Sequence, residues 1–172
     1  MTMKFLRGLM QKIENLNHAL YYVSSLAILL SAFILTYEVI VRYVLRIPTI
    51  WEIESSVYLT VMATYLGAAY GLKDGAHINI DMITRLLPEG FTSKLSLVTS
   101  IISLVFCMLV AWKGWGMWWE ATSKGWVSES LWGPPLTVPY FFLPLGMTLL
   151  SLQYVVLISG LITERGEKSH GS

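Results

Sequence analysis

Residues 19–41 read ALYYVSSLAILLSAFILTYEVIV, and this apolar stretch indicates the class of protein to which the chain belongs. A helix needs about 20 mostly apolar residues to cross the hydrocarbon core of a bilayer. The stretch meets that length, and its one charged residue, Glu38, lies near its end. Only 13% of the 172 residues are charged, whereas soluble domains carry about 25% charged residues. The sequence therefore predicts an integral membrane protein.

Three further stretches have the length and composition of membrane-spanning helices. With the first stretch they predict spans at about 19–41, 50–72, 95–119 and 136–162. Basic residues precede the first stretch, but it is too long for the apolar region of a signal peptide, so we expect it to be retained. We expect residues 1–172 to form a single membrane domain with an all-α fold and four transmembrane helices.

The placement of Lys and Arg predicts the orientation, because cytoplasmic loops carry an excess of these residues. With the N-terminus inside, eight of the 12 lie on the cytoplasmic side, namely Lys4, Arg7, Lys12, Lys73, Arg85, Lys94, Arg165 and Lys168. The outer side then holds Arg42, Arg46, Lys113 and Lys124. We therefore expect both termini to lie in the cytoplasm.

All seven tryptophans fall at the outer end of a span or in the third loop: Trp51, Trp112, Trp115, Trp118, Trp119, Trp126 and Trp132. Indole rings prefer the headgroup layer, so the simpler interpretation is an aromatic belt. A belt normally decorates both membrane faces, whereas this one is lopsided. The alternative is a docking surface for a partner protein, with Trp126 and Trp132 as its candidates.

Charged residues concentrate where the first two spans meet. Glu38, Arg42 and Arg46 are spaced four apart and so share one helix face, while Glu52 and Glu54 open the second span. We interpret the cluster as an ion-paired hairpin that fixes how two helices meet. A coupling-ion or proton site is the alternative, which is less favoured because the charges lie at span ends rather than at the bilayer midplane.

The second span also carries a stripe of small residues. Ala63, Gly67 and Gly71 follow one another at four-residue spacing, which lets another helix approach closely. The stripe predicts a helix-contact face, either to a helix of this chain or to a partner.

The loop after the second span contains a short amphipathic segment. Residues 82–87 place apolar side chains on one face and end before Pro88, so we expect a short cytoplasmic helix lying on the membrane surface between spans two and three. His77 in the same loop is more consistent with a hydrogen-bonding anchor than with a proton relay.

The sequence lacks the residues that several kinds of chemistry require. The sequence shows no nucleophile with a base, no carboxylate cluster, no phosphate-binding motif and no charge at mid-span. We therefore expect neither an enzyme nor a bound cofactor or metal. The net charge of +1 gives no reason to expect nucleic acid as a partner, whereas membrane lipid is expected around the spans.

An ordered series of motifs then resembles one family. The series comprises Arg42-Tyr43, Pro48, Trp51-Glu52-Ile53-Glu54, Gly67-Ala68-Ala69, Gly75-Ala76-His77-Ile78-Asn79-Ile80-Asp81 and Leu87-Pro88. Together they resemble the small membrane subunit, of DctQ type, of tripartite ATP-independent periplasmic (TRAP) transporters. One departure is Asn79, where the family more often has a basic residue.

This resemblance implies a small permease subunit in a heteromeric complex of the bacterial inner membrane. Its partners would be a large membrane subunit, which carries the substrate and sodium sites, and a periplasmic substrate-binding protein that delivers an organic acid for secondary active uptake. The small subunit would brace the scaffold of the large one. By the same resemblance Arg42 and Glu54 would link the first two helices, Gly67 would permit close helix contact, and His77 and Asp81 would anchor the cytoplasmic loop.

Two other functions stay open at this point. A stand-alone small multidrug exporter needs a membrane-embedded carboxylate in its first span, but Glu14 precedes the span and Glu38 lies near its far end. A membrane-anchor subunit of a respiratory complex would normally place histidines within its spans for haem, and the spans contain none suitably paired.

Overall fold

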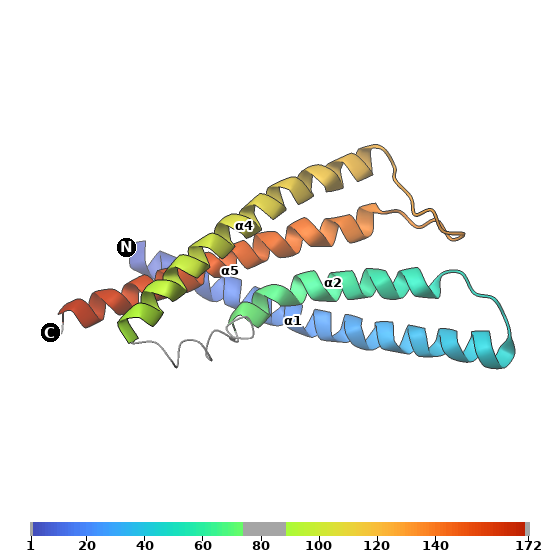
Figure 1. The fold of residues 1–172 in the computed structure, drawn as a ribbon, viewed down its shortest axis with the longest axis horizontal. Helices are drawn as coiled ribbons and strands as arrows, with labels where there is room; N and C mark the ends of the chain where they lie inside the picture. The colour runs from blue at the N-terminus through green and yellow to red at the C-terminus, as the bar shows by residue number, and fades with distance from the viewer. Residues whose placement is uncertain (1, 74–88, 171–172) are drawn as a thin grey trace.

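The computed structural model describes residues 2–73 and 89–170, and these residues form long helices (Figure 1). The elements are α1 (Thr2–Ile40), the π-helical turn η1 (Val41–Leu45), α2 (Glu52–Lys73), α4 (Glu89–Ser123) and α5 (Thr137–His170). Within the described ranges the one β-type pairing is an isolated bridge between Val127 and Pro135. The predicted all-α fold is therefore confirmed.

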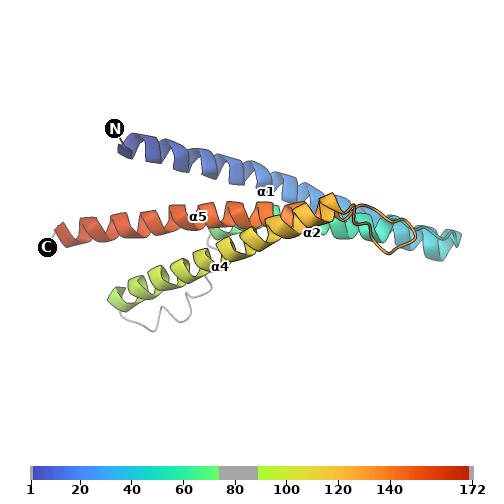
Figure 2. The same cartoon turned by 90° about the horizontal axis from the view of Figure 1, so that it is seen from above.

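The helices form two antiparallel hairpins. α1 packs along α2, α4 packs along α5, and the hairpins meet where α2 contacts α5, so α1 and α4 flank the central pair. The α1–α2 and α4–α5 connections lie at one end of the molecule, and the N- and C-termini lie at the other (Figure 1). Figure 2 shows that α1 and α4 diverge from α5 toward the end that carries the termini.

Three helical stretches are long and apolar enough to cross a membrane: Gln11–Leu45, Leu95–Ser123 and Thr137–Leu161. They indicate a multi-pass membrane protein and match three of the four expected spans. The expected span at 50–72 forms α2, which is not among the three. The count of four spans and the orientation of the termini therefore stay predictions. The expected short helix at 82–87 lies outside the described residues.

α2, like α5, is enclosed by other helices. It lies between α1 and α5, and its buried residues include Glu52 and Ser56 as well as Ala63, Leu66 and Ala69. A helix enclosed by other helices can place polar groups toward them, where lipid does not have to solvate them. Its polar residues are therefore compatible with a position inside the bilayer.

A polar stripe on α1 faces the neighbouring helices. Asn17, Ser24, Ser31 and Glu38 recur every seven residues and are all buried. A seven-residue repeat keeps one face of a helix against its partner over many turns. The repeat therefore sets which side of α1 faces inward, and it leaves the apolar sides of α1 exposed.

Hydrogen bonds tie this stripe to α2 and α5. The Asn17 amide Nδ2 donates to Oε1 of Gln153 on α5 over 2.8 Å, with both side chains buried. Ser31 Oγ lies 3.1 Å from the backbone oxygen of Ser56 and 3.2 Å from Oγ1 of Thr60, both on α2. Hydrogen bonds between helices in a membrane contribute about 0.6 kcal/mol each on average, so these contacts orient the helices more than they stabilise them.

Glycines set how closely the helices approach. Gly67 lies against Ser24 of α1, where a Cβ would sit at an ordinary contact distance of 3.4 Å. Gly146 of α5 is much tighter, because a Cβ there would lie 2.6 Å from Cβ of Tyr65 on α2 and closer still to the Tyr65 carbonyl oxygen. The closest contact between the two hairpins therefore depends on Gly146.

Replacing Gly146 with alanine should separate the hairpins, because the added methyl group meets the rigid backbone of α2. Overpacking of this kind costs about 1–3 kcal/mol, and we expect a lower unfolding temperature of the detergent-purified chain. Gly116→Ala on α4 is the matched control, because a Cβ there meets nothing within 4 Å and alanine favours helix by about 1 kcal/mol. Equal unfolding temperatures for the two variants would contradict the assignment.

Candidate functional site

The end of the molecule that carries both connections gathers most of the residues singled out in the sequence. Arg42, in η1, forms an ion pair with Glu38 one turn earlier, with 2.6 Å between Nη2 and Oε1. The family resemblance implied that Arg42 and Glu54 would link the first two helices, and this role stays a prediction. The ion-pair partner of Arg42 is on its own helix, because residues four apart share one face.

The first hairpin reverses direction just after this ion pair. The carbonyl oxygen of Val41 accepts from the backbone N–H groups of Arg46 and Ile47, which closes the helix end. Arg46 takes the left-handed conformation, with φ 54° and ψ 32°. A non-glycine residue rarely adopts this conformation. The reversal lets the chain run on to α2, where Glu52 is buried and its Oε2 accepts from the N–H of Trp51 over 3.1 Å.

Glu54 joins the two hairpins. Its Oε1 accepts a hydrogen bond from the hydroxyl of Ser128, and its Oε2 accepts one from the hydroxyl of Ser130 over 2.7 Å. Both serines belong to the α4–α5 connection, residues 124–136. Hydrogen bonds to an ionised carboxylate are about twice as strong as neutral ones. Glu54 therefore fixes the second connection to the start of α2.

The α4–α5 connection has a defined fold of its own. Ser128 N donates to Pro134 O and Leu136 N donates to Trp126 O, each over 2.9 Å, on either side of the bridge between Val127 and Pro135. Gly125 and Gly133 both have positive φ, as the two turns of the loop require. The loop is a small hairpin rather than an irregular linker.

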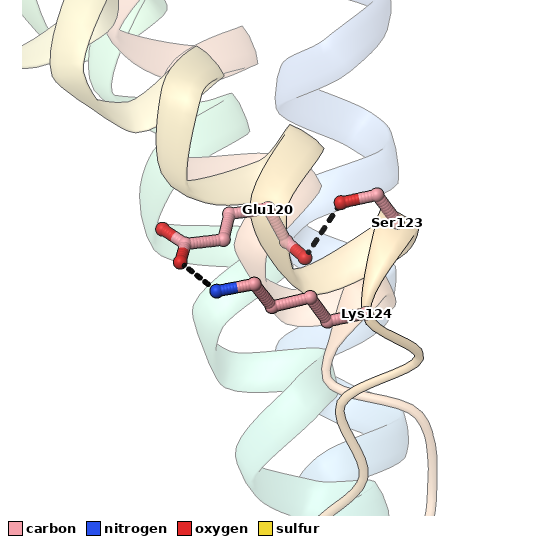
Figure 3. Close-up of polar contacts among 3 residues, drawn as sticks. All are labelled: Glu120, Ser123 and Lys124. Atoms are coloured by element: carbon pink, nitrogen blue, oxygen red, sulfur yellow. Dashed lines mark hydrogen bonds and ion pairs between the residues drawn. The ribbon is translucent and has the colours of Figure 1, made fainter.

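At the start of the loop, α4 ends in a set of local contacts (Figure 3). Lys124 Nζ lies 2.6 Å from Oε1 of Glu120, and the Ser123 hydroxyl donates to the Glu120 backbone oxygen over 3.1 Å. Lys124 Nζ also lies 5.9 Å from the centre of the Trp126 ring. The pair is exposed, and exposed ion pairs contribute roughly 0.2–1 kcal/mol.

The two tryptophans named as docking candidates occupy different environments. Trp126 is half-buried and its ring packs edge-to-face on Tyr140, with 6.4 Å between ring centres. Trp132 is exposed at the tip of the loop beside Leu131, which is 91% exposed. Trp132 and Leu131 are thus available to a partner, whereas Trp126 stabilises the base of the loop.

The other predicted site residues have simpler surroundings. Gly67 lies at the α1–α2 contact, and Gly71 is partly buried on α2. His77 and Asp81 lie outside the described residues. Within residues 2–73 and 89–170, no group of three or more His, Cys, Asp and Glu side chains comes together to hold a metal ion. The contacts described above position helices and loops.

Sequence reasoning missed several residues of this arrangement. The serine partners of Glu54 gave no signal, because they lie 74 and 76 residues away and serine is common in loops. The polar heptad of α1 was readable, since buried hydroxyls and amides at intervals of seven form a regular pattern. Gln153 is a polar residue within an apolar stretch, but nothing in the sequence named Asn17 as its partner.

Comparison with known families supplies the context for this arrangement. Residues 31–164 match the model of the family described as tripartite ATP-independent periplasmic transporters, DctQ component. The match includes η1, all of α2, the α4–α5 connection and most of α5.

Curated relatives carry the same kind of description. The C4-dicarboxylate TRAP transporter small permease protein DctQ of Vibrio cholerae is 26% identical, over 73% of this chain and 63% of that protein. The ectoine TRAP transporter small permease protein TeaB of Halomonas elongata is 26% identical, over 82% of this chain and 72% of that protein. The sialic acid TRAP transporter small permease protein SiaQ of Vibrio cholerae is 32% identical, over 59% and 54%.

The chain thus spans somewhat less than two thirds of the length of the Vibrio cholerae C4-dicarboxylate relative. The family model nevertheless covers well over half of this chain without interruption. The resemblance seen in the motifs from Arg42 to Pro88 is confirmed: the chain belongs to the DctQ component family of the tripartite ATP-independent periplasmic transporters.

Proposed function

We propose that this chain is the small permease subunit of a TRAP transporter and that it braces the scaffold of a large membrane subunit. The transporter would take up an organic acid by sodium-coupled, binding-protein-dependent transport across the bacterial inner membrane. The sodium and substrate sites would lie on the large subunit. Family membership carries the first part of this proposal, and the distribution of polar groups supports the second.

Several polar groups of the described helices form hydrogen bonds within the chain. Asn17 is bonded to Gln153, and Ser31 to α2, while the outward faces of α1 and α4 carry large apolar side chains such as Phe33, Phe106 and Leu109. A subunit that binds cargo needs polar groups directed into an accessible cavity. An inward polar stripe with apolar flanks suits a subunit that packs beside another membrane protein.

The substrate class follows the names of the relatives. Two of the three are named for acids, a C4-dicarboxylate and sialic acid, and the third for ectoine. An organic acid is therefore the substrate we propose. A stand-alone multidrug exporter and a respiratory anchor subunit are not favoured, because the family match assigns the chain to a transporter component.

Reconstitution tests the proposal directly. The chain alone in liposomes should move no organic acid under an inward sodium gradient, whereas the chain with its large subunit and binding protein should show uptake that collapses when sodium is removed. The expected difference arises because the sodium and substrate sites are proposed to lie on the large subunit. Sodium-driven uptake by the chain alone would overturn the proposal.

Two ion pairs with the same N–O distance test whether the chain braces the large subunit. Arg42–Glu38 and Lys124–Glu120 both measure 2.6 Å across four residues, but their side chains are 45% and 10% exposed in the first pair and 60% and 49% in the second. Arg42→Ala leaves a nearly buried carboxylate and should cost roughly 1–2 kcal/mol, less than the loss of a fully buried pair. Lys124→Ala should cost under about 0.5 kcal/mol.

Co-purification of the large subunit with each variant measures this ranking. We expect less large subunit with Arg42→Ala and an unchanged amount with Lys124→Ala. Equal recovery with both variants would count against a role of the first hairpin in assembly.

The link between Glu54 and the α4–α5 loop tests where the binding protein docks. Glu54→Ala frees Ser128 and Ser130, so the exposed tip with Leu131 and Trp132 loses its fixed position. If the binding protein docks there, ordering the loop would cost about 1.4 kcal/mol and raise the apparent KM for binding protein roughly tenfold.

Uptake measured at varied binding-protein concentration gives this KM. Glu120→Ala is the matched control, because it removes an exposed carboxylate from the same end of the molecule without releasing the loop. The same KM for the Glu54 variant and the unaltered protein would exclude docking through this loop.

A further inference from the structure

The first hairpin carries a recess that the proposed function does not use. It has a volume of about 290 Å³ and is lined by Arg42, Arg46, Ile47, Pro48 and Thr49. This is at the lower limit of the range for small-molecule pockets, about 300–1,000 Å³, and it suits a headgroup-sized moiety better than a whole metabolite. The two guanidinium groups make the recess a site for an oxyanion.

Donors in the recess are only partly used. One nitrogen of Arg42 pairs with Glu38, which leaves further N–H donors on a five-donor group. Arg46 forms no ion pair among the described residues, and the Thr49 hydroxyl is a buried atom with no hydrogen-bond partner there. Two cations thus line a space in which one carboxylate, Glu38, offsets only one of the charges.

The backbone at Arg46 is unusual for an arginine. Its left-handed conformation costs a residue with a Cβ about 1–2 kcal/mol, and glycine is the residue that adopts it without penalty. A chain that needed only a tight reversal here would be more stable with glycine. The arginine side chain therefore comes at a cost in stability, which fits a binding role.

The surroundings of the recess are those of a membrane surface. The apolar stretch that can cross the bilayer ends at Leu45, directly before Arg46. Val44, Leu45 and Ile47 are apolar and between 53% and 71% exposed. A ligand held here would place its anionic group on the arginines and an apolar portion along these side chains.

We propose that this recess, named here the Arg42/Arg46 recess, binds the phosphate of an anionic phospholipid. Phosphate in this place has two sources, a lipid headgroup and free phosphate, and the exposed apolar residues beside the arginines favour the lipid. The acyl chains would follow the outer face of η1, and the phosphodiester would contact Arg46 and the free donors of Arg42. The inference holds for either leaflet, and it does not depend on the proposed function.

Native mass spectrometry of the full chain in detergent, titrated with phosphatidylglycerol, tests the proposal. Arg46→Gln should weaken binding roughly fivefold, as expected for one basic residue at a lipid surface. Lys124→Gln, which removes a cation from the other connection at the same end, should leave binding unchanged. Phosphatidylcholine, in which choline neutralises the phosphate charge, should bind the unaltered chain more weakly than phosphatidylglycerol does. Its binding should also fall less on Arg46→Gln than the binding of phosphatidylglycerol.

Arg46→Gly separates loss of the site from loss of the fold. Glycine relieves the left-handed strain, so the unfolding temperature should stay equal or rise while phosphatidylglycerol binding falls to the level of Arg46→Gln. Unchanged binding in both Arg46 variants would overturn the site. Displacement of the lipid by millimolar inorganic phosphate would overturn the lipid as its occupant. If an Arg46 variant still binds the lipid but no longer co-purifies with the large subunit, the recess would instead bind a carboxylate of that subunit.

Discussion

The backbone contact between Gly146 of α5 and Tyr65 of α2 holds the two hairpins together, and the other features of the structure depend on it. Lipid gives helices no hydrophobic reason to associate, so close packing has to supply the attraction. Once α2 and α5 touch, Asn17 can reach Gln153, and Glu54 can reach the loop between α4 and α5. Both hydrogen bonds cross between hairpins and need the helices at this spacing.

Polar residues at defined intervals give this packing its specificity. The heptad on α1 turns hydroxyl, amide and carboxylate groups toward the inner helices. Its Asn17 and Ser31 bond to α5 and α2, whereas Glu38 pairs with Arg42 at the end of the same helix. In hydrocarbon an unpaired polar group costs several kcal/mol, so a rotated α1 would be penalised at every turn. The same arrangement leaves the flanks of α1 and α4 mainly apolar, which is the surface that a lipid or a second membrane subunit can cover.

Much of the fold was predictable, because long apolar runs identify helices with little ambiguity. The expected span at 95–119 falls within α4, and the one at 136–162 begins one residue before α5. The first expected span ends one residue beyond α1, which extends back to Thr2. The predicted ends of the helices were less accurate, because polar turns outside the hydrocarbon core continue a helix without an apolar pattern. α2 formed where a span was expected, yet its glutamates and hydroxyls keep it outside the group of clearly membrane-spanning stretches.

The candidate site was predicted in composition but not in pairing. The sequence placed Arg42, Glu54 and the loop tryptophans at one end of the molecule, and the structure brings them to that end. Which charge meets which partner depends on helix rotation. Helix rotation is set by packing between α2 and α5, and a single sequence does not reveal it. The sequence also did not predict the role of Gly146. The chain has thirteen glycines, and only the three-dimensional contact with Tyr65 distinguishes this one.

The attachment of the α4–α5 loop to Glu54 has a mechanical consequence. This loop belongs covalently to one hairpin and is hydrogen-bonded to the other, so it cross-braces the molecule at that end. At the opposite end α1 and α4 diverge (Figure 2). The helices are therefore held together at the end that carries the loops. Any change in the separation of α1 and α4 is confined to the end that carries the chain termini.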